Sequence, residues 1–136
     1  MKKWLLSCFL LAGSVFGSGL LHAQVTSLHE DFTTCTGSLP AAWYKYSVSG
    51  TDSWNCSSSG YSGNGVMMSG YSNGNNNLNE DWLISPALNL SSYTAPHLDF
   101  WCRTKFSGPY LQVMVSNNYA GSGNPNAATW TALPVV

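Results

Sequence analysis

The sequence predicts an all-β protein built as an antiparallel β-sandwich, and three observations support this fold class. After residue 23, no segment shows the 3.6-residue apolar period of an amphipathic helix. Apolar and polar residues instead alternate in short runs at a spacing of about ten residues, which is typical of sandwich folds. Clusters of Gly, Pro, Asn and Ser, the residues that favour turns, separate these runs.

The clearest alternation covers residues 97–106 and predicts the firmest strand of the protein. The Ser-Gly-Pro segment at 107–109 interrupts it, and residues 110–116 then alternate again. Two such runs joined by a short Gly-Pro loop predict an antiparallel hairpin. One face of the first run carries Leu98, Phe100, Cys102, Thr104 and Phe106, and the other carries His97, Asp99, Trp101, Arg103 and Lys105.

Shorter runs predict the remaining strands, and a polar segment lies among them. Residues 57–79 are rich in Asn, Gly and Ser and contain a near-repeat, 59–64 and 69–74, which predicts two equivalent turns flanking a strand. The last run ends close to Val136, so we expect a sandwich that lacks its last strands or is completed by a partner strand. The further strands are expected at 27–33, 43–48, 53–56, 65–69, 82–85, 87–90 and 129–133.

The first 23 residues are typical of a cleaved secretory signal peptide. Two lysines precede an apolar run, and Leu-His-Ala at 21–23 offers a cleavage site. The run is too short and too interrupted by Gly and Ser for a membrane span, and Cys8 lies too early for a lipid-anchored leader. Residues 24–136 then make one domain with a formal charge of −3, and the absence of a basic patch argues against nucleic acid as a ligand.

Three cysteines follow the predicted leader. Export favours disulfides, and the odd number leaves at least one thiol unpaired. Cys35 and Cys56 lie in polar, turn-rich surroundings and are the expected pair, although sequence alone does not determine the connectivity. Cys102 lies on the apolar face of the 97–106 run, so we expect it to be buried and inert.

Two adjacent acidic pairs stand out among only six carboxylates. Glu30-Asp31 and Glu80-Asp81 each precede an aromatic residue that should anchor the start of a strand. Clustered carboxylates with amide and carbonyl oxygens suit Ca²⁺, which takes six to eight oxygen ligands. The alternative is that both pairs are simply exposed, acidic strand ends.

The polar face of the expected hairpin offers a docking surface for a glycan or a protein. Aromatic and hydrogen-bonding side chains alternate there, which suits recognition, although a loop of the same domain is an equal alternative for covering Trp101. His97 and Asp99 share this face, but a strand would hold their side chains about 7 Å apart, and no nucleophile motif supports catalysis. The candidate ligand-binding residues are Trp101, Arg103, Tyr110 and Gln112.

Several motifs resemble the choice-of-anchor J modules and the related cleaved-adhesin domains of gingipain-type proteins. They are Glu-Asp-Phe at 30–32, Leu-Pro-Ala-Ala-Trp at 39–43, and Asn-Glu-Asp-Trp-Leu-Ile-Ser-Pro-Ala-Leu at 79–88, the most specific of them. Segments 96–101, 111–116, 119–121 and 128–130 continue the similarity. Two departures stand out: Ala42 replaces a common glycine, and a C-terminal segment of the Asp-Asn-Val type is absent.

The resemblance implies a jelly-roll β-sandwich that acts as a non-catalytic, calcium-stabilised module of an exported bacterial protein. It favours Glu30, Asp31 and Asp81 as the calcium ligands. The expected function is therefore binding of a glycan or of an extracellular or surface protein. The alternative is an accessory domain of a secreted nuclease or peptidase whose catalytic domain lies beyond Val136.

Overall fold

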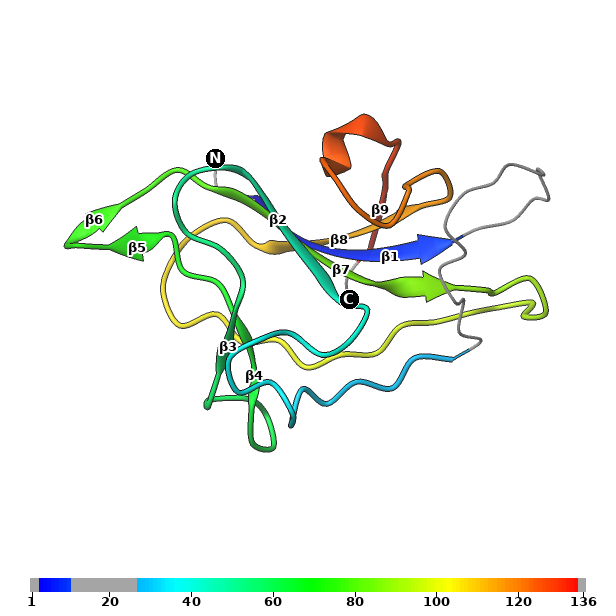
Figure 1. The fold of residues 1–136 in the computed structure, drawn as a ribbon, viewed down its shortest axis with the longest axis horizontal. Helices are drawn as coiled ribbons and strands as arrows, with labels where there is room; N and C mark the ends of the chain where they lie inside the picture. The colour runs from blue at the N-terminus through cyan, green and yellow to red at the C-terminus, as the bar shows by residue number, and fades with distance from the viewer. Residues whose placement is uncertain (1–2, 11–26, 135–136) are drawn as a thin grey trace.

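A computed structural model describes residues 3–10 and 27–134, and these residues form an all-β fold (Figure 1). The one helical element among them is a single 3-10 turn, η1 (Pro125–Ala127). The prediction of an all-β protein is therefore confirmed. The predicted leader cleavage after Ala23 lies outside the described residues.

A five-stranded sheet with the strand order β2-β7-β1-β8-β9 forms the largest part of the fold. The outer pairs β2–β7 and β8–β9 are antiparallel, whereas β1 runs parallel to both of its neighbours. The β1 residues lie in the predicted leader, where no strand was expected. The strands are β1 (Lys3–Leu10), β2 (Tyr44–Ser49), β7 (Glu80–Leu88), β8 (Leu111–Ser116) and β9 (Thr131–Leu133).

Two small antiparallel hairpins lie outside this sheet. The first joins β3 (Asn55–Ser57) to β4 (Gly65–Met67), and the second joins β5 (Tyr71–Ser72) to β6 (Asn75–Asn76). Asn73 and Gly74 form the tight turn of the second hairpin with φ values of 51° and 80°, the left-handed region that Asn-Gly turns occupy. The two predicted turns of the near-repeat therefore do flank β4, and the second hairpin projects at one end of the molecule (Figure 1).

Two of the expected strands do not form. Residues 97–106 are extended but unpaired, so the predicted hairpin with residues 110–116 is wrong, and only β8 remains of it. Residues 27–33 are also irregular. In both cases the chain has alternating residues but no neighbouring strand to complete its backbone hydrogen bonds, and pattern alone does not supply one.

The core is built around β7. Residues 81–85 are all buried, on both faces of the sheet, as in strands that are covered from two sides. On one face, Trp82 and Ile84 pack with Tyr119, and Tyr44, Tyr46 and Trp130 surround them. The ring centroids of Trp82 and Trp130 are 4.8 Å apart, so this cluster connects β7 to the C-terminal part of the chain.

Candidate functional site

The four predicted ligand-binding residues are all exposed, but they do not share a strand face. Arg103 and Trp101 lie on the irregular 97–106 segment, Tyr110 follows it, and Gln112 lies on β8. Because the predicted hairpin is absent, the expected cross-strand arrangement of Trp101 with Tyr110 and Gln112 is wrong. A loop of the same domain, the alternative for covering Trp101, covers it only in part, since 75% of its surface is exposed.

Trp101 instead forms a parallel stack with Tyr61. Their ring centroids are 3.9 Å apart and the ring planes differ by 5°, yet Tyr61 is 72% exposed. Each ring therefore has one face against the other ring and one face open to solvent. Sequence reasoning missed Tyr61, although it is an isolated aromatic residue within the polar near-repeat, and that was an available signal.

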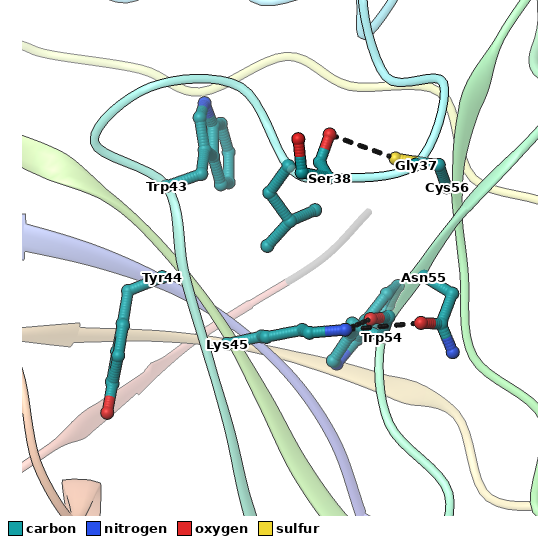
Figure 2. Close-up of a pocket in the computed structure, with 9 residues that line it drawn as sticks. Gly37, Ser38, Trp43, Tyr44, Lys45, Trp54, Asn55 and Cys56 are labelled. Carbon is teal, nitrogen blue, oxygen red and sulfur yellow. Dashed lines mark hydrogen bonds between the residues drawn. The ribbon is translucent and has the colours of Figure 1, made fainter.

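A pocket of about 360 Å³ lies between β2, β3 and the loop that precedes β2 (Figure 2). The Lys45 side chain extends across the pocket. Its Nζ donates hydrogen bonds to the Trp54 carbonyl oxygen at 2.8 Å and to Asn55 Oδ1 at 3.1 Å. The only basic group of the pocket is therefore used internally. Its lining comprises Gly37, Ser38, Leu39, Trp43, Tyr44, Lys45, Trp54, Asn55 and Cys56.

An acidic corner, defined by Asp52, Glu80 and Asp81, forms where β7 begins. Asn79 Nδ2 donates to Asp52 Oδ2 at 3.2 Å, and Asn79 Oδ1 accepts the Asp52 backbone N–H at 3.4 Å. Gly50 allows this close approach: its φ is +94°, and a Cβ there would overlap the Asn79 side chain. Buried Asn79 thus holds the Asp52 loop against the start of β7.

Asp81 is the unusual member of the acidic corner. It is only 1% exposed, and neither carboxylate oxygen has a hydrogen-bond partner among the described residues. Burial raises the pKa of Asp81 to about 6; the Asp52 and Glu80 carboxylates add to this, and the nearby Ser47 hydroxyl partly opposes it. The Ser47 hydroxyl also lies 3.3 Å from the Ser49 carbonyl oxygen and 3.4 Å from the Asp52 carbonyl oxygen, so its single proton is shared among several acceptors.

The structure does not assemble the predicted calcium set of Glu30, Asp31 and Asp81. In the ranges it describes, no three His, Cys, Asp or Glu side chains are placed to share a metal ion. Glu30 Oε1 accepts the Phe32 N–H at 2.7 Å, and Asp31 Oδ1 accepts the Thr33 N–H at 2.9 Å. The hydrogen bonds from Thr33 lower the pKa of exposed Asp31, with a smaller contribution from His29.

The cysteines follow the predicted pairing but not the predicted burial. Cys35 and Cys56 form a disulfide with a Cα–Cα distance of 5.3 Å, and it joins the irregular N-terminal segment to β3. Cys102 is unpaired, but it is exposed and not buried, because the strand expected to hide it does not form.

His97 and Asp99 also differ from their predicted arrangement. His97 Nε2 lies 3.3 Å from Asp99 Oδ2, closer than the separation of about 7 Å expected for their side chains along a strand. Both side chains are more than four-fifths exposed. The pair is therefore solvated, and interactions between exposed charged groups contribute little to stability.

No family model matches this chain, and neither curated proteins nor solved structures give a significant match to it. The resemblance to the choice-of-anchor J modules therefore stays a prediction. In the part of the chain that the structure describes, no helix has the length and apolar character to cross a membrane.

Proposed function

We propose that this protein is a non-catalytic binding module that recognises a glycan or a surface protein through the stacked Tyr61–Trp101 pair. The observation that carries the proposal is the combination of stacking and exposure in these two rings. Large aromatic rings normally bury most of their surface, so a stacked pair of rings that faces solvent favours a binding surface.

The surroundings of the pair favour a glycan. Tyr61 belongs to the 57–79 segment, whose side chains are mainly uncharged amides and hydroxyls. Asn64, three residues from Tyr61, donates its Nδ2 hydrogen bond to the Thr33 carbonyl oxygen at 2.9 Å, which anchors this loop to the N-terminal segment. A flat apolar ring face beside uncharged hydrogen-bonding groups matches a sugar, which has an apolar C–H face and a rim of hydroxyls.

The pair can be tested with the substitutions Trp101→Ala and Tyr61→Ala, measured by binding to glycan and extracellular-matrix protein arrays. We expect each variant to lose at least tenfold in affinity, because each substitution removes one ring and leaves the other unsupported. The double variant should lose little more than either single one, since the two rings act as a unit.

Tyr71→Ala is the matched control for these variants. Tyr71 occupies the position equivalent to Tyr61 in the second copy of the near-repeat, and it is 56% exposed. We expect the Tyr71→Ala variant to bind with the affinity of the unaltered protein. Unchanged binding in the Trp101 and Tyr61 variants, or an equal loss in the Tyr71 variant, would contradict the proposal.

The same surface also serves the second candidate, an accessory domain of a secreted hydrolase. In that case the stacked pair brings a polymeric substrate to a catalytic domain beyond Val136. Binding by residues 24–136 is common to both candidates, so the array experiment tests that shared part. The Cys35–Cys56 disulfide supports export, because disulfides persist in oxidising compartments.

We further propose that Ca²⁺ stabilises the module through Asp81. A buried carboxylate with two free oxygens is a suitable ligand for a hard cation, and the second carboxylate of the corner, Asp52, lies close enough to affect it. The full predicted set does not fit, since Glu30 and Asp31 are engaged in local turns.

The calcium proposal predicts a higher melting temperature in millimolar Ca²⁺ than in a chelator, because an ion that binds only the folded state shifts the unfolding equilibrium. Melting followed by circular dichroism measures the shift, with Mg²⁺ as the control ion. The shift should vanish in Asp81→Asn and persist in Glu30→Gln. Equal melting temperatures with calcium and with chelator would refute it.

A further inference from the structure

The central strand of the five-stranded sheet comes from the segment that the sequence predicts to be removed. β1 (Lys3–Leu10) pairs in parallel with β7 from Lys3↔Glu80 to Leu10↔Leu88, and with β8 from Trp4↔Leu111 to Phe9↔Ser116. Residues 4–10 of this strand belong to the apolar run of the predicted leader, and Lys3 belongs to its charged start. Cleavage after residue 23 would therefore take away the strand that joins the two halves of the sheet.

Removal of β1 leaves a slot between two strands that face each other. Because neighbouring strands lie about 4.8 Å apart, β7 and β8 would be separated by about 9.5 Å, the width that one strand fills. Each would present a row of unpaired N–H and C=O groups to the slot. Such groups have a high free-energy cost when they are shielded from water and lack partners.

Contacts that do not involve β1 hold the two halves at this spacing. The Trp82 ring of β7 contacts Trp130, which directly precedes β9, and Trp130 contacts Tyr119 at a centroid distance of 5.3 Å. The Gly123 N–H donates to the Tyr44 hydroxyl of β2 at 3.4 Å. These contacts join the β2–β7 half to the β8–β9 half without the participation of β1.

The register defines which strand the slot accepts. Leu6 is in register with both Leu83 and Val113, two of the most buried residues of the protein. One position on, Ser7 is in register with Ile84 and Met114. The neighbouring side chains of Leu83 and Val113 are buried, so a strand that fills the slot should be uncharged at this position.

We propose that the processed protein uses the slot between β7 and β8 to bind one extended apolar strand, about eight residues long, donated in parallel register by a partner polypeptide. The binding energy comes from two rows of backbone hydrogen bonds and from burial of an apolar side chain at the position that Leu6 occupies. This inference depends on cleavage of the leader and is independent of the Tyr61–Trp101 surface.

The full chain carrying Leu6→Asp provides the test. A carboxylate in register with Leu83 and Val113 should expel β1 from the sheet while leaving it attached, which opens the slot. The probe is a synthetic Lys3–Leu10 peptide with Cys8→Ser and three added C-terminal lysines for solubility, labelled with a fluorophore. We expect this peptide to bind the variant at least 100-fold more tightly than it binds the unaltered chain.

The matched control is the same peptide with Leu6→Asp, which should bind at least tenfold more weakly. The unmodified peptide should also raise the melting temperature of the Leu6→Asp variant toward that of the unaltered chain. This rise can be measured even if the variant without peptide is poorly folded. Equal binding of both peptides, no rescue, or hydrogen-exchange protection, without peptide, of the β7 and β8 N–H groups that face β1 would overturn the proposal. A concentration-dependent dimer that excludes the peptide would also overturn it, because a second copy would then fill the slot.

Discussion

Replacing Trp82 with alanine is expected to reduce the free energy of unfolding by about 3–5 kcal/mol, the range for large aromatic residues removed from a packed core. Trp82 is buried at the centre of the cluster formed with Ile84 and Tyr119, and its ring contacts Trp130 across the sheet. The loss would be a large fraction of the 5–15 kcal/mol that stabilises a typical domain. Urea unfolding followed by circular dichroism measures it directly.

Trp101→Ala is the control for this substitution, because it removes the same side chain from an exposed position. We expect it to cost less than about 1 kcal/mol. Trp82→Phe keeps most of the apolar volume and should reduce the free energy of unfolding by an intermediate amount. It can be compared with Trp101→Ala even if the Trp82→Ala variant does not fold. Similar losses for Trp82→Ala and Trp101→Ala would show that the cluster does not stabilise the fold.

Asp81→Asn is expected to remove a pH dependence of stability and to make the protein more stable at neutral pH in the absence of calcium. The folded-state pKa of Asp81 is about 6, above its ordinary value of 3.8, so the folded protein retains a proton that the unfolded chain releases. Stability from this group is therefore complete below about pH 4 and is lost as the pH rises through 6. The loss is on the order of 3 kcal/mol.

Urea unfolding at several pH values between 4 and 7.5, in chelator, measures this dependence as the difference between the variant and the unaltered protein. That difference should grow from pH 4 to 6 and then stay constant. Asp99→Asn makes the same chemical change at an exposed carboxylate and should give no such difference. A constant Asp81→Asn difference across the range would show that the carboxylate is not destabilised in the fold.

The sequence predicted the fold class and several of the strands that have partners. Residues 43–48, 65–69 and 110–116 correspond to β2, β4 and β8 with shifts of one or two residues, because their alternating side chains have a covered face to pack on. Residues 97–106 alternate just as clearly, yet Phe106 and Leu98 remain exposed. Alternation shows that a segment can be a strand, but the availability of a neighbouring strand determines whether it is one.

Pro86 explains why two strands were expected where the structure has only β7. A proline lacks the N–H of a sheet ladder, so it normally ends a strand. Here the pairing with β2 stops at Ile84, and the pairing with β1 has an irregularity between Ser7↔Ile84 and Phe9↔Ala87. Pro86 lies in this bulge, where no N–H is needed, and the strand continues to Leu88.

The candidate sites were predictable to different degrees. Trp101 was found because it is a large aromatic residue among polar ones, whereas its partner Tyr61 is distant in sequence and lies in a loop. Asp81 was found as one of a pair of carboxylates, but its burial depends on how β7 packs. β1 was missed because a largely apolar segment such as Lys3–Leu10 is equally typical of a leader and of a strand in the interior of a sheet.

The Cys35–Cys56 bridge limits how far the chain extends when tension is applied to it. The bridge encloses a sequence separation of 21 residues, including β2. When tension is applied along the chain, force passes through the covalent bridge and bypasses this loop, which cannot extend. An oxidised molecule therefore lengthens by about 70 Å less than a reduced one before it is fully stretched. The redox state of Cys35 and Cys56 therefore determines the maximum length of the stretched chain.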